Sequence, residues 1–220
     1  MKAAYHCLMA KTLHYFFDPL CGWCYGASPA VSGLLGAPDV TVKLWPTGLF
    51  GGDGARTMDD GFAAFAWTND QRIQQLTGQA FTEAYRQQVL GNRQQRFDSG
   101  PATLALTAVA LTTPAREYDA LKSIQQARYV DGSDVTSPAT LAGLLVSLGL
   151  EQAASRMSMP DAALVAANAK RIQEAQSLMR SLNARGVPTL VAESGARRWV
   201  VNISAAYSNP QALLDELEAA

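Results

Sequence analysis

Two cysteines separated by two residues, Cys21 and Cys24, constrain this chain more than any other feature of its sequence. They stand where a continuous apolar run, 13–17, gives way to residues 27–35, whose apolar positions have helical spacing. The run is typical of a strand buried on both faces, so a strand is expected to lead into a helix that begins at Cys21. Unpaired N–H groups at a helix start favour a thiolate. The pair therefore predicts a nucleophile at Cys21 and, one turn further on, a resolving thiol at Cys24.

The same spacing also occurs in metal knuckles, so a second interpretation is a zinc-stabilised binding module. Cys7 and His14 would then complete a set of three thiolates and one imidazole. The chain contains no second Cys-x-x-Cys motif, and this favours the redox interpretation with no metal site. The metal content of the reduced protein would separate the two interpretations.

A proline near the far end of the chain is the second informative feature. Val187 and Pro188 open an apolar run, 187–192, which a short polar turn separates from a second run, 197–203. The spacing predicts an antiparallel hairpin, and the first residues of a strand tolerate a proline that lacks an N–H group. An ordinary trans proline at a strand edge is the alternative, because most X–Pro bonds are trans.

With these features in this order, the chain resembles the thioredoxin superfamily and, within it, the DsbA family. The resemblance is nearest to the branch of FrnE-like oxidoreductases, hydroxychromene carboxylate isomerases and kappa-class glutathione transferases. In that branch the first strand also runs through aromatic residues into an aspartate, here Asp18, three residues before the catalytic position. The resemblance implies that Val187–Pro188 is the family's cis-proline, packed against the redox pair, and that Pro29 kinks the first helix.

One position departs from the family pattern. Tyr15 stands six residues before Cys21, where thioredoxin and DsbA carry a buried acid. Proton transfer to or from Cys24 by an acid at that position is therefore not expected in this chain.

The resemblance implies an α/β thioredoxin fold with a large α-helical domain inserted between the second strand and the cis-proline strand. The expected domains are 1–46 with 184–220 for the thioredoxin-like part and 47–183 for the insertion. Thr57 is expected to cap the first inserted helix. The family places such a domain over the active-site face, which makes Ser99 a candidate for facing the cysteines. A plain helix cap is the alternative role for Ser99.

Charge and composition exclude some classes of partner. The 220 residues include 18 basic and 19 acidic side chains, so the net charge of −1 gives no reason to expect nucleic acid or a membrane as partner. His6 and Lys11 interrupt the apolar stretch at the start, so no signal peptide is expected there. The interpretation is a cytoplasmic protein, with Met9 as an alternative start and Cys7 as an incidental thiol.

The sequence thus predicts a thiol–disulfide oxidoreductase in which Cys21 attacks and Cys24 resolves. Glutathione is the expected co-substrate, with protein thiols or disulfides as the alternative partner and no tightly bound cofactor. Trp23, Val187, Pro188 and Ser99 are the candidate substrate-binding residues. The alternative within the same branch is a glutathione-dependent isomerase or transferase, which needs no resolving cysteine.

Overall fold

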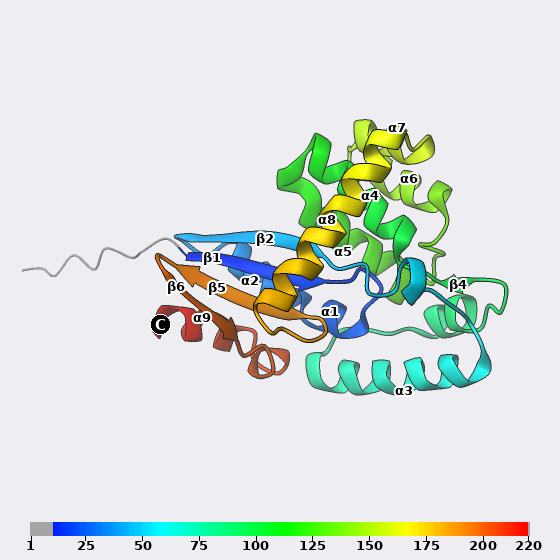
Figure 1. The fold of residues 1–220 in the computed structure, drawn as a ribbon. Coiled ribbons are helices and arrows are strands. Elements are labelled where there is room, and N and C mark those ends of the chain that lie inside the picture. Colours follow the sequence, from blue (N-terminus) through cyan, green and yellow to red (C-terminus); the bar gives the residue numbers. More distant parts are fainter. Residues whose placement is uncertain (1–10, 220) are drawn as a thin grey trace, which may run out of the picture.

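The computed structural model describes residues 11–219, and a four-stranded sheet of order β2-β1-β5-β6 lies at their centre (Figure 1). β1 (Lys11–Phe17) pairs in parallel with β2 (Val40–Pro46). β1 also pairs antiparallel with β5 (Thr189–Ser194), which continues antiparallel into β6 (Arg197–Val201). The central position of β1 explains why its sequence is apolar on both faces.

Different helices cover the two faces of this sheet. On one face Tyr15 belongs to the main core, which includes residues of α1 (Gly22–Gly26) and α2 (Ser28–Leu35). On the other face Phe16 packs in a smaller cluster with residues of α8 (Ala162–Ser181). Successive side chains of a strand point to opposite faces, so β1 contributes side chains to the core on each face of the sheet.

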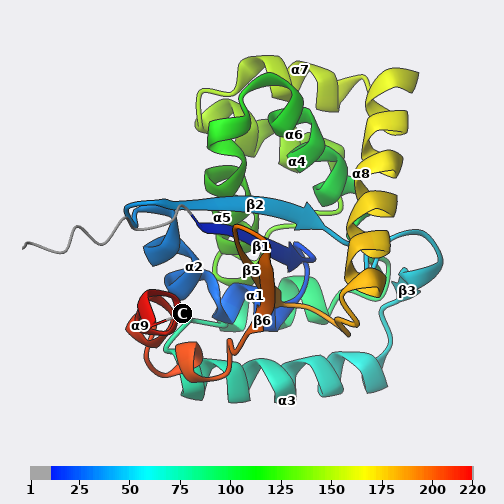
Figure 2. The ribbon, with the colours of Figure 1, turned by 60° about the vertical axis from the view of Figure 1, so that its left-hand side comes forward.

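The final helix and the first helical segment complete the layer around the redox motif. α9 (Gln211–Ala219) packs against α2 (Figure 2). α1 ends at Gly26, and Pro29 lies in the opening turn of α2, where a missing N–H group leaves no helical hydrogen bond unmade. The predicted break at Pro29 is confirmed.

The chain between β2 and β5 is mostly helical. Its helices, with one π-helical turn, are α3 (Asp60–Thr77), the turn Tyr85–Leu90, α4 (Gly100–Thr112), α5 (Glu117–Tyr129), α6 (Pro138–Ser147), α7 (Glu151–Ser158) and α8. α3 packs against α1, and α8 packs against β2, so this segment reaches both faces of the sheet (Figure 1). The division into residues 1–46 with 184–220 and residues 47–183 stays a prediction.

Two local predictions about these elements are wrong. Thr57 does not cap α3, because it pairs with Arg96 in a short ladder between β3 (Arg56–Thr57) and β4 (Arg96–Phe97). Asp59 takes the cap instead, and its Oδ1 accepts the Phe62 N–H at 2.7 Å. The hairpin strands also differ from expectation, since β5 is displaced by two residues to 189–194 and β6 already ends at 201. Within 11–219, no helix is both long and apolar enough to cross a membrane.

Candidate active site

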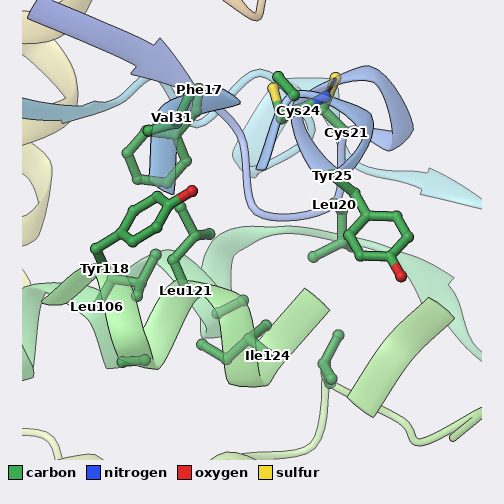
Figure 3. Close-up of a cluster of buried hydrophobic side chains, with 14 of the residues drawn as sticks. Phe17, Leu20, Cys21, Cys24, Tyr25, Val31, Leu106, Tyr118, Leu121 and Ile124 are labelled. Carbon is green, nitrogen blue, oxygen red and sulfur yellow. Dashed lines mark hydrogen bonds between the residues drawn. The ribbon is translucent and has the colours of Figure 1, made fainter. Parts of the chain in front are cut away.

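The cysteine pair lies at the start of α1, directly beyond the carboxyl end of β1. Cys21 is the helix cap, and its Sγ accepts the Cys24 N–H at 3.4 Å (Figure 3). Cys21 is 7% exposed and lines a cavity, whereas Cys24 is 1% exposed and does not. Burial raises the pKa of Cys24 well above its usual range, and the neighbouring Cys21 raises it further. Of the two thiols, only Cys21 can be reached from the cavity.

The Val187–Pro188 segment lies against the same sulfur. Its peptide bond is cis, and the Cys21 thiol donates to the Val187 carbonyl oxygen at 3.7 Å. The expected proximity of this segment to Cys21 is therefore present, although 166 residues separate the two in sequence.

Trp23, between the two cysteines, is held on both sides. Its ring centroid lies 5.0 Å from that of Tyr207, and the Arg72 guanidinium lies 5.9 Å from its centroid. Trp23 is partly buried and lines the cavity beside Cys21. The indole thus connects α1 to α3 and to the turn before α9, and it also presents an apolar surface to the cavity.

The cavity has a volume of about 200 Å³, and half of the residues that line it are aromatic. Besides Trp23, the rings come from five separate stretches of the chain and are Phe50, Phe62, Phe65, Phe97, Tyr85 and Tyr129. Several of them pack edge to face, including Phe50 on Phe97 and Tyr85 on Tyr129, with ring centroids 4.8 and 5.1 Å apart. Phe65 is 65% exposed, so the cavity is bordered by apolar surface that solvent can reach.

Asp18 is a fully buried carboxylate that holds the loop in front of Cys21. Its Oδ1 accepts the Leu20 N–H at 2.9 Å, and its Oδ2 accepts the Phe50 N–H at 3.1 Å. The Ser99 hydroxyl donates to the same Oδ2 at 2.7 Å. Burial raises the pKa of Asp18, while these three bonds and the charge of Arg128 act in the opposite direction.

The prediction that Ser99 faces the cysteines as a substrate-binding residue is corrected by this contact. Ser99 is completely buried, does not line the cavity, and directs its hydroxyl to Asp18. Ser99 does stand at the N-cap position of α4, as the plain-cap alternative has it, but its side chain makes no capping hydrogen bond there. The Ser99 side chain reaches the site through Asp18, and its backbone N–H donates to the carbonyl oxygen of Phe50, which lines the cavity.

Asp70, on α3, is a second buried acid, and it lines the cavity together with Cys21. Its Oδ2 accepts the Tyr85 hydroxyl at 2.8 Å. Its Oδ1 approaches Gly22 so closely that a Cβ built on this glycine would lie 2.6 Å away. Burial raises the pKa of Asp70 to about 7, against the lowering effects of Tyr85 and Arg128.

A buried cation stands near both acids. Arg128 of α5 is 2% exposed, and its guanidinium lies 5.2 to 5.6 Å from the ring centroids of Tyr85, Phe97 and Tyr129. Its Nε and Nη2 have no hydrogen-bond partner in the part of the chain that the structure describes. Its charge lowers the pKa of Asp18 and of Asp70, so both acids are electrostatically coupled to one guanidinium.

Tyr15 occupies the position of the family's buried acid and cannot replace it. Its hydroxyl donates to the Cys24 carbonyl oxygen at 3.3 Å, and burial raises its pKa well above the usual range. His14 is part of a different contact, because its Nδ1 accepts the Trp45 indole N–H and its Nε2 lies 3.4 Å from Glu193. Over residues 11–219, His, Cys, Asp and Glu side chains form no group of three that could hold a metal, and Cys7 lies outside those residues.

Sequence reasoning missed Asp70, Tyr85 and Arg128. A signal for Asp70 was present, since it lies seven residues after Ala63 and three before Ile73, on the buried face of α3. An acid on such a face requires a partner or a raised pKa. The partners come from other elements, so the sequence alone does not identify them.

The comparisons agree with this geometry. The sequence model of the DSBA-like thioredoxin domain matches residues 12–207. The cytosolic disulfide reductase DsbM from Pseudomonas aeruginosa is 32% identical over 94% of this chain and 97% of that chain, with a TM-score of 0.84. Its structure with GSH gives 30% identity, 94% and 98% coverage, and a TM-score of 0.80.

A more distant structure shares the fold alone. DsbA from Pseudomonas aeruginosa is 15% identical over 99% of this chain and 85% of that chain, with a TM-score of 0.54. Among curated proteins there is no match. Given the family match, the nearly complete overlap with DsbM and the cysteine pair at the helix start, this chain belongs to the DsbA-like thioredoxin family and is a thiol–disulfide oxidoreductase.

Proposed function

We propose that this enzyme reduces disulfides through Cys21 and Cys24, with glutathione as its co-substrate. The observation that carries the proposal is the unequal placement of the two sulfurs. Cys21 lines the cavity, while Cys24 is buried behind it and has a raised pKa. A thiol placed like Cys21 meets the substrate first, and one placed like Cys24 reacts only with a partner already attached to Cys21.

The reaction takes place in two exchanges. The Cys21 thiolate attacks one sulfur of a substrate disulfide, forms a mixed disulfide and releases the other half as a thiolate. Cys24 then loses its proton and attacks the Cys21 sulfur, which releases the second substrate thiolate and leaves a Cys21–Cys24 disulfide. Two glutathione molecules return this disulfide to the dithiol and become oxidised glutathione.

The groups around Cys21 give the substrate three contacts. The Val187 carbonyl oxygen accepts from the Cys21 thiol, a cis bond joins Val187 to Pro188, and Trp23 lines the cavity. We assign the Val187–Pro188 segment to the backbone of a bound peptide or glutathione. We assign Trp23 to its apolar part.

Support for glutathione and for a cytosolic location comes from one relative. DsbM is described as a cytosolic disulfide reductase, and one of its structures contains GSH. The alternative of a glutathione-dependent isomerase or transferase gives no role to Cys24, which is placed to reach Cys21 from within the first turn. Membership of the branch with FrnE-like oxidoreductases, hydroxychromene carboxylate isomerases and kappa-class glutathione transferases stays a prediction.

A trapping variant tests the proposal. With Cys24→Ser the mixed disulfide at Cys21 cannot be resolved, so the variant recovered from cells should carry a glutathione adduct, detected by intact mass and removed by a reductant. Cys21→Ser is the matched control and should carry no adduct at residue 24. A protein adduct at Cys21 without any glutathione adduct would show that the partner is a protein and not glutathione. No adduct of either kind would overturn the assignment of Cys21 as nucleophile.

A further inference from the structure

We propose that Asp70 is a catalytic acid that protonates the substrate thiolate released at Cys21. The inference rests on the proposed function, because it concerns the leaving group of the same exchange. The sequence offers no candidate for this proton transfer, since the position of the family's buried acid holds Tyr15.

The position of Asp70 is the first argument. Asp70 and Cys21 line one cavity, and Oδ1 of Asp70 lies against Gly22, the residue that follows Cys21. A larger side chain at Gly22 would meet this oxygen, so the glycine is what lets α3 bring the carboxyl group to the first turn of α1. A thiolate that is released into the cavity, from the substrate sulfur that Cys21 attacks, therefore remains close to Asp70.

The free hydrogen-bonding capacity of Asp70 is the second argument. Its Oδ2 accepts from Tyr85, whereas Oδ1 has no hydrogen-bond partner within the described residues 11–219. Asp18, the other buried acid near the pair, is occupied by three donors and does not line the cavity. Of these two acids, only Asp70 has an oxygen free to exchange a proton with a bound substrate.

The charges around Asp70 explain how it keeps a proton near neutrality. The polar groups around it are Tyr85 from the π-helical turn, Arg128 and Tyr129 from α5, and Cys21 from the N-cap of α1. The single positive charge of Arg128 can offset only one buried carboxylate. Asp18 accepts three hydrogen bonds, so it is more readily held as the anion than Asp70 is. Asp70 has one donor, and its pKa is raised to about 7. Transfer of its proton to an ordinary thiolate, whose conjugate thiol has a pKa of about 8.5, is favourable.

The proton balance of the step is simple. When Cys21 attacks a disulfide, the sulfur–sulfur bond breaks and its electron pair stays on the departing sulfur. The Asp70 carboxylic acid gives its proton to this sulfur, so a neutral thiol leaves and a carboxylate remains. Solvent at the open edge of the cavity then returns the proton to Asp70.

Two disulfides that differ in their leaving groups test this role. Bis(2-hydroxyethyl) disulfide releases a basic alkyl thiolate, whereas 5,5′-dithiobis(2-nitrobenzoate) releases an aromatic thiolate that needs no proton at neutral pH. The measured quantity is the ratio of the two single-turnover rates with reduced enzyme. Asp70→Asn should lower the alkyl-to-aromatic ratio by ~10²-fold, the lower end of the range for general acid catalysis. Asp215→Asn on α9 removes an exposed carboxylate and is the matched control.

The pH dependence gives a readout that a structural role would not produce. The ratio cancels the ionisation of Cys21, which both substrates share. In the wild type the ratio should fall as the pH rises through about 7, because Asp70 loses its proton there, and in Asp70→Asn it should be flat. Tyr85→Phe removes a bond that lowers the pKa of Asp70, so the fall should move to higher pH. This variant also tests the proposal if Asp70→Asn does not fold.

The possible results separate the two proposals. An unchanged ratio in Asp70→Asn, or a wild-type ratio that does not change with pH, would overturn the role of Asp70 and leave the oxidoreductase function standing. If wild-type enzyme reduces neither disulfide, the proposed function itself fails, and the inference fails with it.

Discussion

Asp18→Ala should lower the free energy of unfolding by on the order of 3–5 kcal/mol, as expected when one member of a buried charged network is removed. The side chain is completely buried and accepts three hydrogen bonds. Alanine would leave two backbone N–H groups and the Ser99 hydroxyl without an acceptor. Each buried donor left unpaired costs about 1–3 kcal/mol. Arg128 would also lose the better of its two compensating anions.

Urea unfolding at constant pH measures this loss, and Ser99→Ala gives a graded comparison. That variant removes one of the three donors and leaves the carboxylate with the other two, so its cost should be about 1–3 kcal/mol. Asp215→Asn should match the wild type, because its carboxylate is exposed. A cost for Asp18→Ala no larger than that of Ser99→Ala would mean that Asp18 is not the centre of the network.

The same network shows where sequence reasoning succeeds and where it stops. The cysteine pair at a helix start was predictable from a local pattern, whereas the break near Pro29 and the position of Val187–Pro188 beside the pair followed from the family resemblance. Ser99 also looked local, as a cap before a helix. Its partner Asp18 is 81 residues away, and only the folded chain shows that the hydroxyl turns toward it.

For Asp70, the difficulty lies in predicting what buries it. Its spacing from Ala63 and Ile73 puts it on the apolar face of its helix, but its neighbours Asn69, Gln71 and Arg72 are polar, and the sequence does not show what covers that face. Burial depends on the close crossing of α3 over α1, which in turn depends on Gly22 and Gly26, where an added Cβ would lie 2.6 Å from Asp70 and 2.7 Å from Ile73. Such an approach of two helices cannot be derived from the periodicity of either one.

Asp70→Asn should stabilise the protein more at pH 8 than at pH 5, and the sign follows from the raised pKa. In the folded state this carboxyl group titrates at about 7, whereas its ordinary value is 3.8. Between these values the folded protein holds a proton that the unfolded chain has released, so the wild type loses stability as the pH rises. Asparagine does not titrate and avoids this loss. From pH 5 to pH 8 the stability of the variant relative to the wild type should rise by about 3 kcal/mol.

Urea unfolding of both proteins at the two pH values measures this difference directly. Burial also raises the pKa of Asp18 and Glu117, but both proteins contain these groups, so their effects cancel in the comparison. Asp215→Asn should show no such pH dependence relative to the wild type, since its carboxylate is exposed. An equal effect of Asp70→Asn at pH 5 and pH 8 would mean that Asp70 is already ionised well below neutrality. It would then hold no proton to give to a thiolate at pH 7, so this equilibrium measurement bears on the catalytic acid independently of any rate.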